Sequence, residues 1–290
     1  MEQIMANKVW FITGTSRGFG RALAEAALDR GDSVVATARD TRFLDDLVRG
    51  SAGRAVAVPL DVTDETAAET AIAAGVEAFG RIDVVVNNAG YADFGSIEET
   101  PPARFRAQIE TNLFGVVNVS RVAIPVFRQQ GHGRFIQFST IGGRRAGGPG
   151  LAAYTAAKHG VEGFSEALAS ETAPFGVKVT LIEPGGFRTD WAGSSMTVIE
   201  PGDAYQQTLG VLLGIFRSGM QAAGDPAKAA QVILQVADMD EPPLRLPLGT
   251  DAVTLIRQGD EAKLAEIAAW ETLSVSTDAD DAVHPDLSRL

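Results

Sequence analysis

Short apolar runs rich in Val and Ile alternate with helix-like segments through the first 180 residues, and this alternation restricts the fold more than any other feature of the sequence. Two strands joined through a helix form a right-handed βαβ unit with parallel strands. Strands that are apolar on both sides are typical of a sheet covered by helices on both faces. The pattern therefore predicts an α/β fold with a doubly wound parallel sheet of about seven strands.

The expected elements follow one another without a long break. Strands are expected over residues 8–13, 33–38, 55–60, 83–87, 133–139, 177–182 and 244–248. Helices are expected over residues 18–30, 41–49, 64–79, 101–129, 151–173, 225–237 and 250–270. Because no internal repeat or low-complexity linker separates them, we expect one domain over residues 1–290. Residues 274–290 contain four Asp and are expected to form a mobile acidic tail.

The composition excludes several classes of protein. A formal net charge of −12 argues against nucleic acid as a partner, because phosphate binding needs a basic face. The absence of Cys excludes disulfides and thiolate metal sites, and the three His residues show no metal-ligand spacing, so we expect no metal. No apolar run approaches the length of a membrane span, and residues 1–8 lack the apolar stretch of a secretory signal. We therefore expect a cytoplasmic protein with no membrane partner.

A glycine-rich turn joins the first expected strand to the first expected helix. It reads Gly14-Thr15-Ser16-Arg17-Gly18-Phe19-Gly20. Glycines permit a tight turn and close approach of the backbone to a ligand. The following helix N-terminus offers free N–H groups and a partial positive charge to a pyrophosphate. The turn therefore predicts a site for a dinucleotide cofactor.

Two arginines indicate which dinucleotide is bound. Arg39 ends the second expected strand, where an enzyme that uses NAD usually places an acid for the ribose 2′-hydroxyl. An arginine suits a 2′-phosphate instead, and Arg17 in the glycine turn is placed to reach the same group. The pair favours NADP. Asp40 follows Arg39, so NAD stays open as an alternative.

Polar and small residues follow the third and fourth expected strands at the same edge of the sheet. Asp61 and Val62 come after the third strand, and Asn87-Asn88-Ala89-Gly90 closes the fourth. Ligands of such sheets bind at the carboxyl ends of the strands. Both segments are therefore candidates for contact with the cofactor.

Tyr154 and Lys158 lie four residues apart on an expected helix. Residues at this spacing share one helix face, so an ammonium is held close to a phenol. A nearby positive charge favours phenolate and lowers the pKa of a tyrosine from its reference value of about 10. A tyrosine tuned in this way can exchange protons in a reaction. The pair is therefore a candidate for acid–base catalysis.

Taken together, these residues resemble the short-chain dehydrogenase/reductase family, in its compact single-domain branch. The resemblance covers residues 8 to about 250 and implies a Rossmann-type sheet with helices on both faces. The matching residues keep the order and spacing of the family: Thr13-Gly14-x-x-x-Gly18-x-Gly20, Asn87-Asn88-Ala89-Gly90, Asn112, Ser139-Thr140-x-x-Gly143, Tyr154-x-x-x-Lys158 and Pro184-Gly185.

The resemblance implies a catalytic role for each of three residues, besides the hydroxyl that orients the substrate. Tyr154 would be the general acid in carbonyl reduction and the base in the reverse reaction. Lys158 would lower the pKa of that tyrosine and bind the nicotinamide ribose. Asn112 would hold a water of the proton relay. The implied reaction is a reversible, NADP(H)-dependent reduction of a ketone or aldehyde to an alcohol, in which the nicotinamide supplies hydride.

The family usually orients its substrate with a serine three residues before a glycine, and this chain departs from that pattern. Gly143 places the role on Thr140, with Ser139 just before it. Adjacent strand residues point to opposite faces, so only one of the two hydroxyls is expected to face the substrate. We assign this role to Thr140, which keeps a hydroxyl donor and adds a methyl group that narrows the pocket.

The resemblance also implies the cofactor-binding residues. Asp61 and Val62 would contact the adenine, Asn88 to Gly90 the ribose, and the segment from Pro184 to Thr189 the nicotinamide. The full predicted set is Gly14, Ser16, Arg17, Gly18, Phe19, Gly20, Arg39, Asp61, Val62, Asn88, Ala89, Gly90, Tyr154, Lys158, Pro184, Gly185, Phe187 and Thr189.

Residues 187–224 look like the variable substrate lid of the family. Their apolar run Leu209–Phe216 favours a hydrophobic carbonyl substrate, although the same face could simply pack on the core. Arg144 and Arg145 are interpreted as a solvated loop. Two other functions stay open: an NAD-dependent alcohol dehydrogenase that works oxidatively, and a non-catalytic sensor or scaffold of the same fold. The family implies a homodimer or homotetramer.

Overall fold

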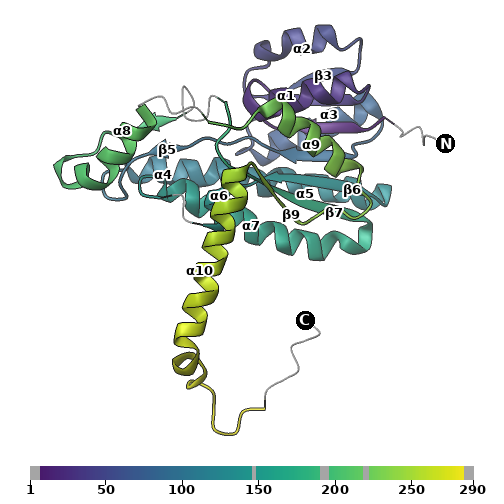
Figure 1. Ribbon diagram of the computed structural model, residues 1–290. Coiled ribbons are helices and arrows are strands. Elements are labelled where there is room, and N and C mark those ends of the chain that lie inside the picture. Colours follow the sequence, from purple (N-terminus) through teal and green to yellow (C-terminus); the bar gives the residue numbers. More distant parts are fainter. Residues whose placement is uncertain (1–6, 146–147, 190–195, 218–221, 284–290) are drawn as a thin grey trace.

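A computed structural model describes residues 7–145, 148–189, 196–217 and 222–283. In these residues, seven strands form one sheet in the order β3-β2-β1-β4-β6-β7-β9, with every neighbouring pair parallel (Figure 1). This confirms the predicted doubly wound α/β fold. The strands of the sheet are β1 (Val9–Ile12), β2 (Ser33–Ala38), β3 (Ala55–Pro59), β4 (Val84–Asn87), β6 (Gly133–Phe138), β7 (Val177–Pro184) and β9 (Arg245–Leu248).

Alternate side chains of each strand enter two separate cores. Trp10 and Ile12 of β1 pack in the core that α1 and α9 cover. Val9 and Phe11 enter the opposite core, beneath α3, α5 and α7. Because successive strand residues point to opposite faces, an apolar strand can fill both layers. The helices are α1 (Gly18–Asp29), α2 (Asp45–Gly50), α3 (Glu65–Phe79), α4 (Pro102–Ile109), α5 (Gly115–Gln130), α6 (Ile141–Arg144), α7 (Ala152–Thr172), α8 (Val211–Arg217), α9 (Pro226–Asp238) and α10 (Thr250–Val275).

The helix expected over residues 101–129 is interrupted. A π-helical turn, Glu110–Phe114, separates α4 from α5 and contains Asn112. Such a turn makes i→i+5 hydrogen bonds in place of i→i+4 bonds, so it adds a residue without breaking the helix. The apolar residues keep a helical period over the whole segment, so the sequence pattern did not predict the π-helical turn.

A second, two-stranded parallel sheet was not expected. It pairs β5 (Asp93–Phe94) with β8 (Thr197–Val198) and so joins the turn after β4 to the predicted lid. Two-residue strands are too short to produce an alternating pattern, which explains why the sequence did not predict them. Residues 190–195 and 218–221 of the predicted lid lie outside the described residues.

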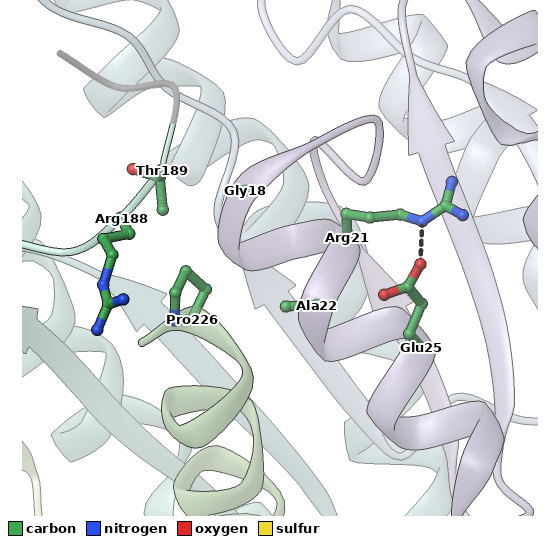
Figure 2. Close-up of a pocket in the computed structure, with 7 residues that line it drawn as sticks. All are labelled: Gly18, Arg21, Ala22, Glu25, Arg188, Thr189 and Pro226. Atoms are coloured by element: carbon green, nitrogen blue, oxygen red, sulfur yellow. Dashed lines mark hydrogen bonds and ion pairs between the residues drawn. The ribbon is translucent and has the colours of Figure 1, made fainter. Parts of the chain in front are cut away.

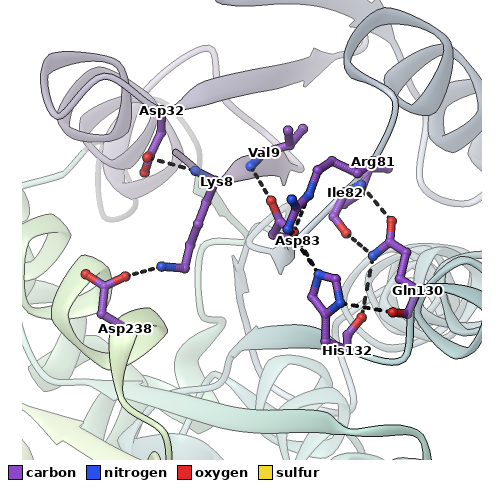
Figure 3. Close-up of polar contacts among 9 residues, drawn as sticks. All are labelled: Lys8, Val9, Asp32, Arg81, Ile82, Asp83, Gln130, His132 and Asp238. Carbon is purple, nitrogen blue, oxygen red and sulfur yellow. Dashed lines mark hydrogen bonds and ion pairs between the residues drawn. The ribbon is translucent and has the colours of Figure 1, made fainter. Parts of the chain in front are cut away.

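Polar side chains connect the amino ends of neighbouring strands through hydrogen bonds and ion pairs (Figure 3). The Asp83 carboxylate accepts hydrogen bonds from the backbone N–H of Val9 at 2.8 Å and from Arg81 Nε at 2.8 Å, and it lies 3.1 Å from His132 Nε2. Asp83 is only 4 % exposed, so these partners compensate for its lost hydration. One carboxylate therefore holds together the starts of β1, β4 and β6.

Helix α10 projects from the body of the molecule (Figure 1). Its start is docked through the buried Ala252 and Ile256, but every described residue from 261 onward is exposed. The helix ends at Val275, five residues beyond the expected end. Residues 284–290 of the predicted acidic tail lie outside the described residues. Within the part of the chain that the structure describes, no helix has both the length and the apolar character needed to cross a membrane.

Candidate active site

The glycine-rich turn after β1 has the backbone geometry that the sequence predicts. Gly14 and Gly18 have φ of +71° and +61°, a conformation that other residues adopt only with strain. A Cβ atom at Gly20 would overlap the Gly14 carbonyl oxygen and lie 2.6 Å from Asn88 Nδ2. A side chain cannot be accommodated there, so the turn packs tightly against the start of α1.

The N-terminus of α1 offers its N–H groups to a ligand. Arg17 occupies the N-cap position in an extended conformation and makes no side-chain capping bond, and the first turn carries no acidic residue. Helix N-termini are usually capped by a side chain or bound to an anion. The turn therefore fits the pyrophosphate of a dinucleotide.

Two strand ends are fastened together at this point. The Asn88 side-chain amide donates to the carbonyl oxygens of Thr13 and Gly14, at 2.8 and 3.0 Å. The Thr13 hydroxyl accepts from the backbone N–H groups of Asn88 and Ala89, at 2.9 and 3.0 Å. The turns after β1 and β4 are thus bonded to one another, and the predicted residues Asn88 and Ala89 lie against the glycine turn.

A depression of about 490 Å³ opens beside Gly18 (Figure 2). Thr189, which follows β7 in the chain, lies across from Gly18: a Cβ at Gly18 would be 3.7 Å from Thr189 Cβ. Arg188 also lines the depression, and it lies within the predicted segment 184–189 but was not itself named among the cofactor residues. Arg21 is a further lining residue that was missed, and its Nε donates to Glu25 at 2.6 Å. Arg188 therefore adds positive charge near the predicted pyrophosphate position, whereas the charge of Arg21 is paired with the carboxylates of Glu25 and Asp46.

The residues predicted near the adenosine occupy three strand ends. Arg39 is exposed at the end of β2. Asp40, next to it, accepts two bonds from Arg42 Nε, at 3.0 and 3.1 Å, and caps the 3₁₀ turn Thr41–Leu44. These bonds lower the pKa of Asp40 below its usual range. After β3, Asp61 accepts from the Thr63 hydroxyl at 2.8 Å, and Val62 is buried.

The segment after β7 is anchored by Asp251 of α10. Gly185 N–H donates to Leu248 O at 2.9 Å, and Gly186 N–H donates to Asp251 at 2.7 Å. The ring of Phe187 packs on that of Phe19 with the ring centres 4.9 Å apart. Both phenylalanines were predicted to bind cofactor, and the contact between their rings joins the start of α1 to the segment after β7.

Tyr154 and Lys158 are both buried on one face of α7, at 9 % and 4 % exposure. The Lys158 ammonium lies 5.9 Å from the centre of the Tyr154 ring and donates to the carbonyl oxygen of Phe138, the last residue of β6, at 2.6 Å. Burial lowers the pKa of Lys158 to about 8, and the charge of Glu162 opposes this fall. The lysine is therefore fixed at the strand end, within reach of the phenol.

Asn112 is fully buried in the π turn, and its side-chain amide makes two hydrogen bonds to the backbone of Tyr91. Its Oδ1 accepts from Tyr91 N–H at 3.0 Å, and its Nδ2 donates to Tyr91 O at 2.7 Å. Gly90 lies between this amide and the lysine, since a Cβ there would be 3.0 Å from Asn112 Oδ1 and 3.9 Å from Lys158 Nζ. The structure thus brings Asn112, Gly90 and Lys158 together.

The two adjacent hydroxyls after β6 point to different partners. Ser139 is buried, and its hydroxyl donates to the carboxylate of Glu162. Thr140 is half-buried, and its Oγ1 lies 3.4 Å from Pro184 O. The Ser139 hydroxyl is therefore turned toward α7 and bound there, whereas the Thr140 hydroxyl faces Pro184, the last residue of β7.

A buried group of charges next to these residues was not predicted. Glu162 and Glu183 are 6 % and 0 % exposed, and Arg245 Nε lies 2.9 and 3.6 Å from their carboxylates. Arg144, interpreted from sequence as part of a solvated loop, instead belongs to α6 and contacts Glu183 at 3.2 Å as well as Asp260. Its side chain is only 25 % exposed, so that interpretation was wrong. Burial, followed by the neighbouring charge of Glu162, raises the pKa of Glu183 to about 7.

Apolar side chains surround Tyr154 on its other side. It shares a cluster with Phe94, Leu151, Leu209 and Leu213, the last two from the predicted lid. Phe94 also meets Phe216 of α8 in an edge-to-face contact, with the ring centres 5.8 Å apart. The phenol therefore borders an apolar environment. Among the described residues, no three acidic or His side chains gather as metal ligands would.

Comparison with known proteins places the chain among enzymes. The family model for short chain dehydrogenases matches residues 8–198. Oxidoreductase BOA17 of Botryotinia fuckeliana is 48 % identical over 272 residues, which is 93 % of this chain and 99 % of the relative. The 3-ketodihydrosphingosine reductase of Bacteroides thetaiotaomicron is 32 % identical over 84 % of this chain and 89 % of its own length.

A solved structure agrees with these sequence comparisons. The crystal structure of a short-chain dehydrogenase from Streptomyces avermitilis superposes with a TM-score of 0.88 at 41 % identity, covering 94 % of this chain and 99 % of that one. The chain belongs to the short-chain dehydrogenase/reductase family and is an oxidoreductase that depends on NAD(P).

Proposed function

We propose that this enzyme reduces a hydrophobic ketone or aldehyde with NADPH, reversibly, and that Tyr154 is the general acid. The observation that carries the proposal is the position of the phenol. Tyr154 lies between a buried lysine on one side and an apolar cluster on the other. The first neighbour supports proton transfer, and the second suits an apolar substrate.

The charges near the adenosine end support NADP over NAD. An exposed Arg39 and an exposed Arg17 carry positive charge to the place where the 2′-phosphate would lie. Asp40, the acid that follows Arg39 in the chain and could bind a ribose hydroxyl, is already held by Arg42 and by its own capping bond. An oxidative enzyme that uses NAD would need that carboxylate to be available.

The chemistry at the carbonyl divides between the cofactor and the chain. The bound nicotinamide supplies the hydride. Tyr154 donates a proton to the oxygen on which negative charge develops, and the Thr140 hydroxyl donates a second hydrogen bond to that oxygen. The Lys158 ammonium stabilises the phenolate that remains. General acids of this kind contribute about 10²–10⁴-fold in rate.

Asn112 has a supporting part in this scheme. Both ends of its amide already bind the backbone of Tyr91, which fixes the turn that carries Gly90 toward Lys158. A π turn leaves a backbone carbonyl without its usual helical partner. We propose that the water of the proton relay binds at such a carbonyl, while the side chain holds the turn in place.

The apolar surroundings of Tyr154 support a hydrophobic substrate. Leu209 and Leu213 of the lid and Phe94 of β5 are buried in the cluster that contains the phenol. One relative is named for the reduction of 3-ketodihydrosphingosine, a ketone. We further propose a single domain over residues 1–290 with residues 187–224 as lid, and a homodimer or homotetramer.

A binding titration tests the cofactor assignment. Quenching of tryptophan fluorescence is measured with NADPH and with NADH, for the native protein and for Arg39→Asp. We expect NADPH to bind at least about tenfold more tightly, a difference of about 1.4 kcal/mol, and the variant to lose that preference. Arg49→Asp is the matched control, since it makes the same change of charge at an exposed arginine of α2 that is not predicted to contact the cofactor.

The contrary results are distinct. Tighter binding of NADH by the native protein would overturn the assignment and favour alcohol oxidation. If both variants lost the preference for NADPH over NADH equally, the preference would come from the overall positive charge of this surface and not from a contact between Arg39 and the 2′-phosphate. Absence of binding by either cofactor would favour a scaffold without turnover.

A further inference from the structure

The buried charges behind Lys158 form a connected group drawn from four elements. We call Glu162, Glu183, Arg144 and Arg245 the carboxylate cluster. Glu162 lies on α7, Glu183 on β7, Arg144 on α6 and Arg245 on β9. The two carboxylates are almost completely buried, and each arginine side chain is about one-quarter exposed, at 25 % and 23 %. Burying so much charge is unfavourable unless the groups are paired.

Glu162 is the member of this cluster nearest to the catalytic residues. One oxygen of its carboxylate accepts a hydrogen bond from the hydroxyl of Ser139, the residue directly before Thr140. The other oxygen accepts a hydrogen bond from Arg245 Nε at 2.9 Å. Gly143 closes over this contact, since a Cβ there would lie 3.2 Å from Glu162 Oε1 and would overlap the Ser139 oxygen. The carboxylate is therefore held in one orientation between β6, α6 and β9.

Glu162 also follows Lys158 by one helical turn, on the same face of α7. The groups that face the lysine are Tyr154 and Glu162 on its own helix, the Phe138 carbonyl of β6, and Gly90 with Asn112 across from it. Of these groups, Glu162 carries the negative charge. An ammonium that is 4 % exposed needs such a charge nearby to stay protonated.

Glu162 in turn is faced by charges from three elements besides its own. Arg245 approaches from β9, and Glu183 of β7 shares that arginine at 3.6 Å. Arg144 of α6 pairs with Glu183. On α7 itself, Glu166 binds the outer face of Arg245. The arginines thus compensate both buried carboxylates.

We propose that Glu162 is a positioning residue that holds Lys158 as an ammonium beneath Tyr154 and holds Ser139 away from the substrate. The proposal deepens the proposed function and rests on Tyr154 and Lys158 as its acid–base pair. Its carboxylate acts through these residues and does not touch the reacting atoms. Arg245 fixes that carboxylate. A residue of β9 thereby helps to position the acid–base pair, which lies on α7.

Tyrosinate absorbance tests the proposal without a substrate or a cofactor. The chain has three Tyr residues, so Tyr91→Phe with Tyr205→Phe leaves Tyr154 as the only one that titrates. In this background, Glu162→Gln removes the charge and keeps the shape of the side chain. Lys158 then loses its proton at lower pH, and the phenolate loses its partner. We expect the tyrosinate signal to move to higher pH by about one unit.

Glu166→Gln is the matched control. It removes a carboxylate that binds the same arginine, one turn further along α7, but its side chain is 57 % exposed. We expect no movement of the tyrosinate signal in this variant. An unchanged signal in Glu162→Gln would overturn the proposal, and so would equal shifts in the two variants.

A second variant covers the case in which Glu162→Gln does not fold. Glu162→Gln combined with Arg245→Met removes both partners and leaves Glu183 paired with Arg144, so no buried charge is left alone. The tyrosinate signal is expected to move in the same direction, and its failure to move would count equally against the proposal. The tyrosinate titration needs no turnover. If the enzyme failed to reduce carbonyl compounds, the proposal for Glu162 could therefore still be tested, and the two failures would appear in different measurements.

Discussion

At the scale of single residues, the sequence identifies the candidate acid–base pair but not the buried charges that lie behind it. Tyr154 and Lys158 can be paired from their spacing alone, because i and i+4 share a helix face. Glu162 has the same relation to Lys158 and was still missed. A Glu beside a Lys on a helix usually forms a solvated pair, and only the packing of β6 and β9 shows that this one is buried.

The choice between Thr140 and Ser139 is also made at this scale. Ser139 is buried against Glu162, whereas the Thr140 hydroxyl faces the carboxyl end of β7 at Pro184. We expect Thr140→Ala to lower kcat/KM for carbonyl reduction by about 10²-fold, the effect of losing one donor to a developing oxyanion. Ser139→Ala is expected to cause a much smaller loss, and steady-state kinetics of both variants gives the comparison. The opposite ranking would return the role to Ser139.

At the scale of elements, regular strands and helices are predictable, and local irregularities are not. The seven strands of the main sheet were expected from their apolar runs. The π turn around Asn112 and the short pair β5–β8 were not, because one extra residue in a helix and two-residue strands leave no periodic signal. Both features lie at the site, where departures from regular structure are to be expected.

The joint between β1, β4 and β6 allows a prediction about stability. Asp83 is buried and accepts bonds from Val9, Arg81 and His132 (Figure 3). Asp83→Ala leaves these donors unpaired, so we expect a loss of about 2–4 kcal/mol in the free energy of unfolding, measured by urea denaturation. Activity per folded molecule should be retained, because this joint lies at the opposite edge of the sheet from Tyr154.

An exposed ion pair provides the control for Asp83. Glu241 is 84 % exposed and binds Lys178 at 2.8 Å. Glu241→Ala should change the free energy of unfolding by less than about 0.5 kcal/mol, as is usual for pairs at the surface. Equal losses in the two variants would show that burial of Asp83 is not the cause.

At the scale of the whole molecule, the order of elements was enough to predict the fold, because a strand–helix alternation allows few topologies. The same order brings the ends of β1, β4, β6 and β7 to one edge, which explains why candidate cofactor residues could be proposed from the sequence. The carboxylate cluster could not be. Its members come from α6, α7, β7 and β9, far apart in sequence, and nothing local marks them as neighbours.

The central claim is that Tyr154 donates the proton in an NADPH-dependent reduction of a hydrophobic carbonyl. The most direct measurement follows NADPH consumption over a panel of aliphatic and aromatic ketones and aldehydes, for the native enzyme and for Tyr154→Phe. The account predicts turnover that increases with the apolar size of the substrate. It also predicts a loss of about 10²–10⁴-fold in kcat for the variant, with NADPH binding retained. Turnover that survives in Tyr154→Phe would contradict it.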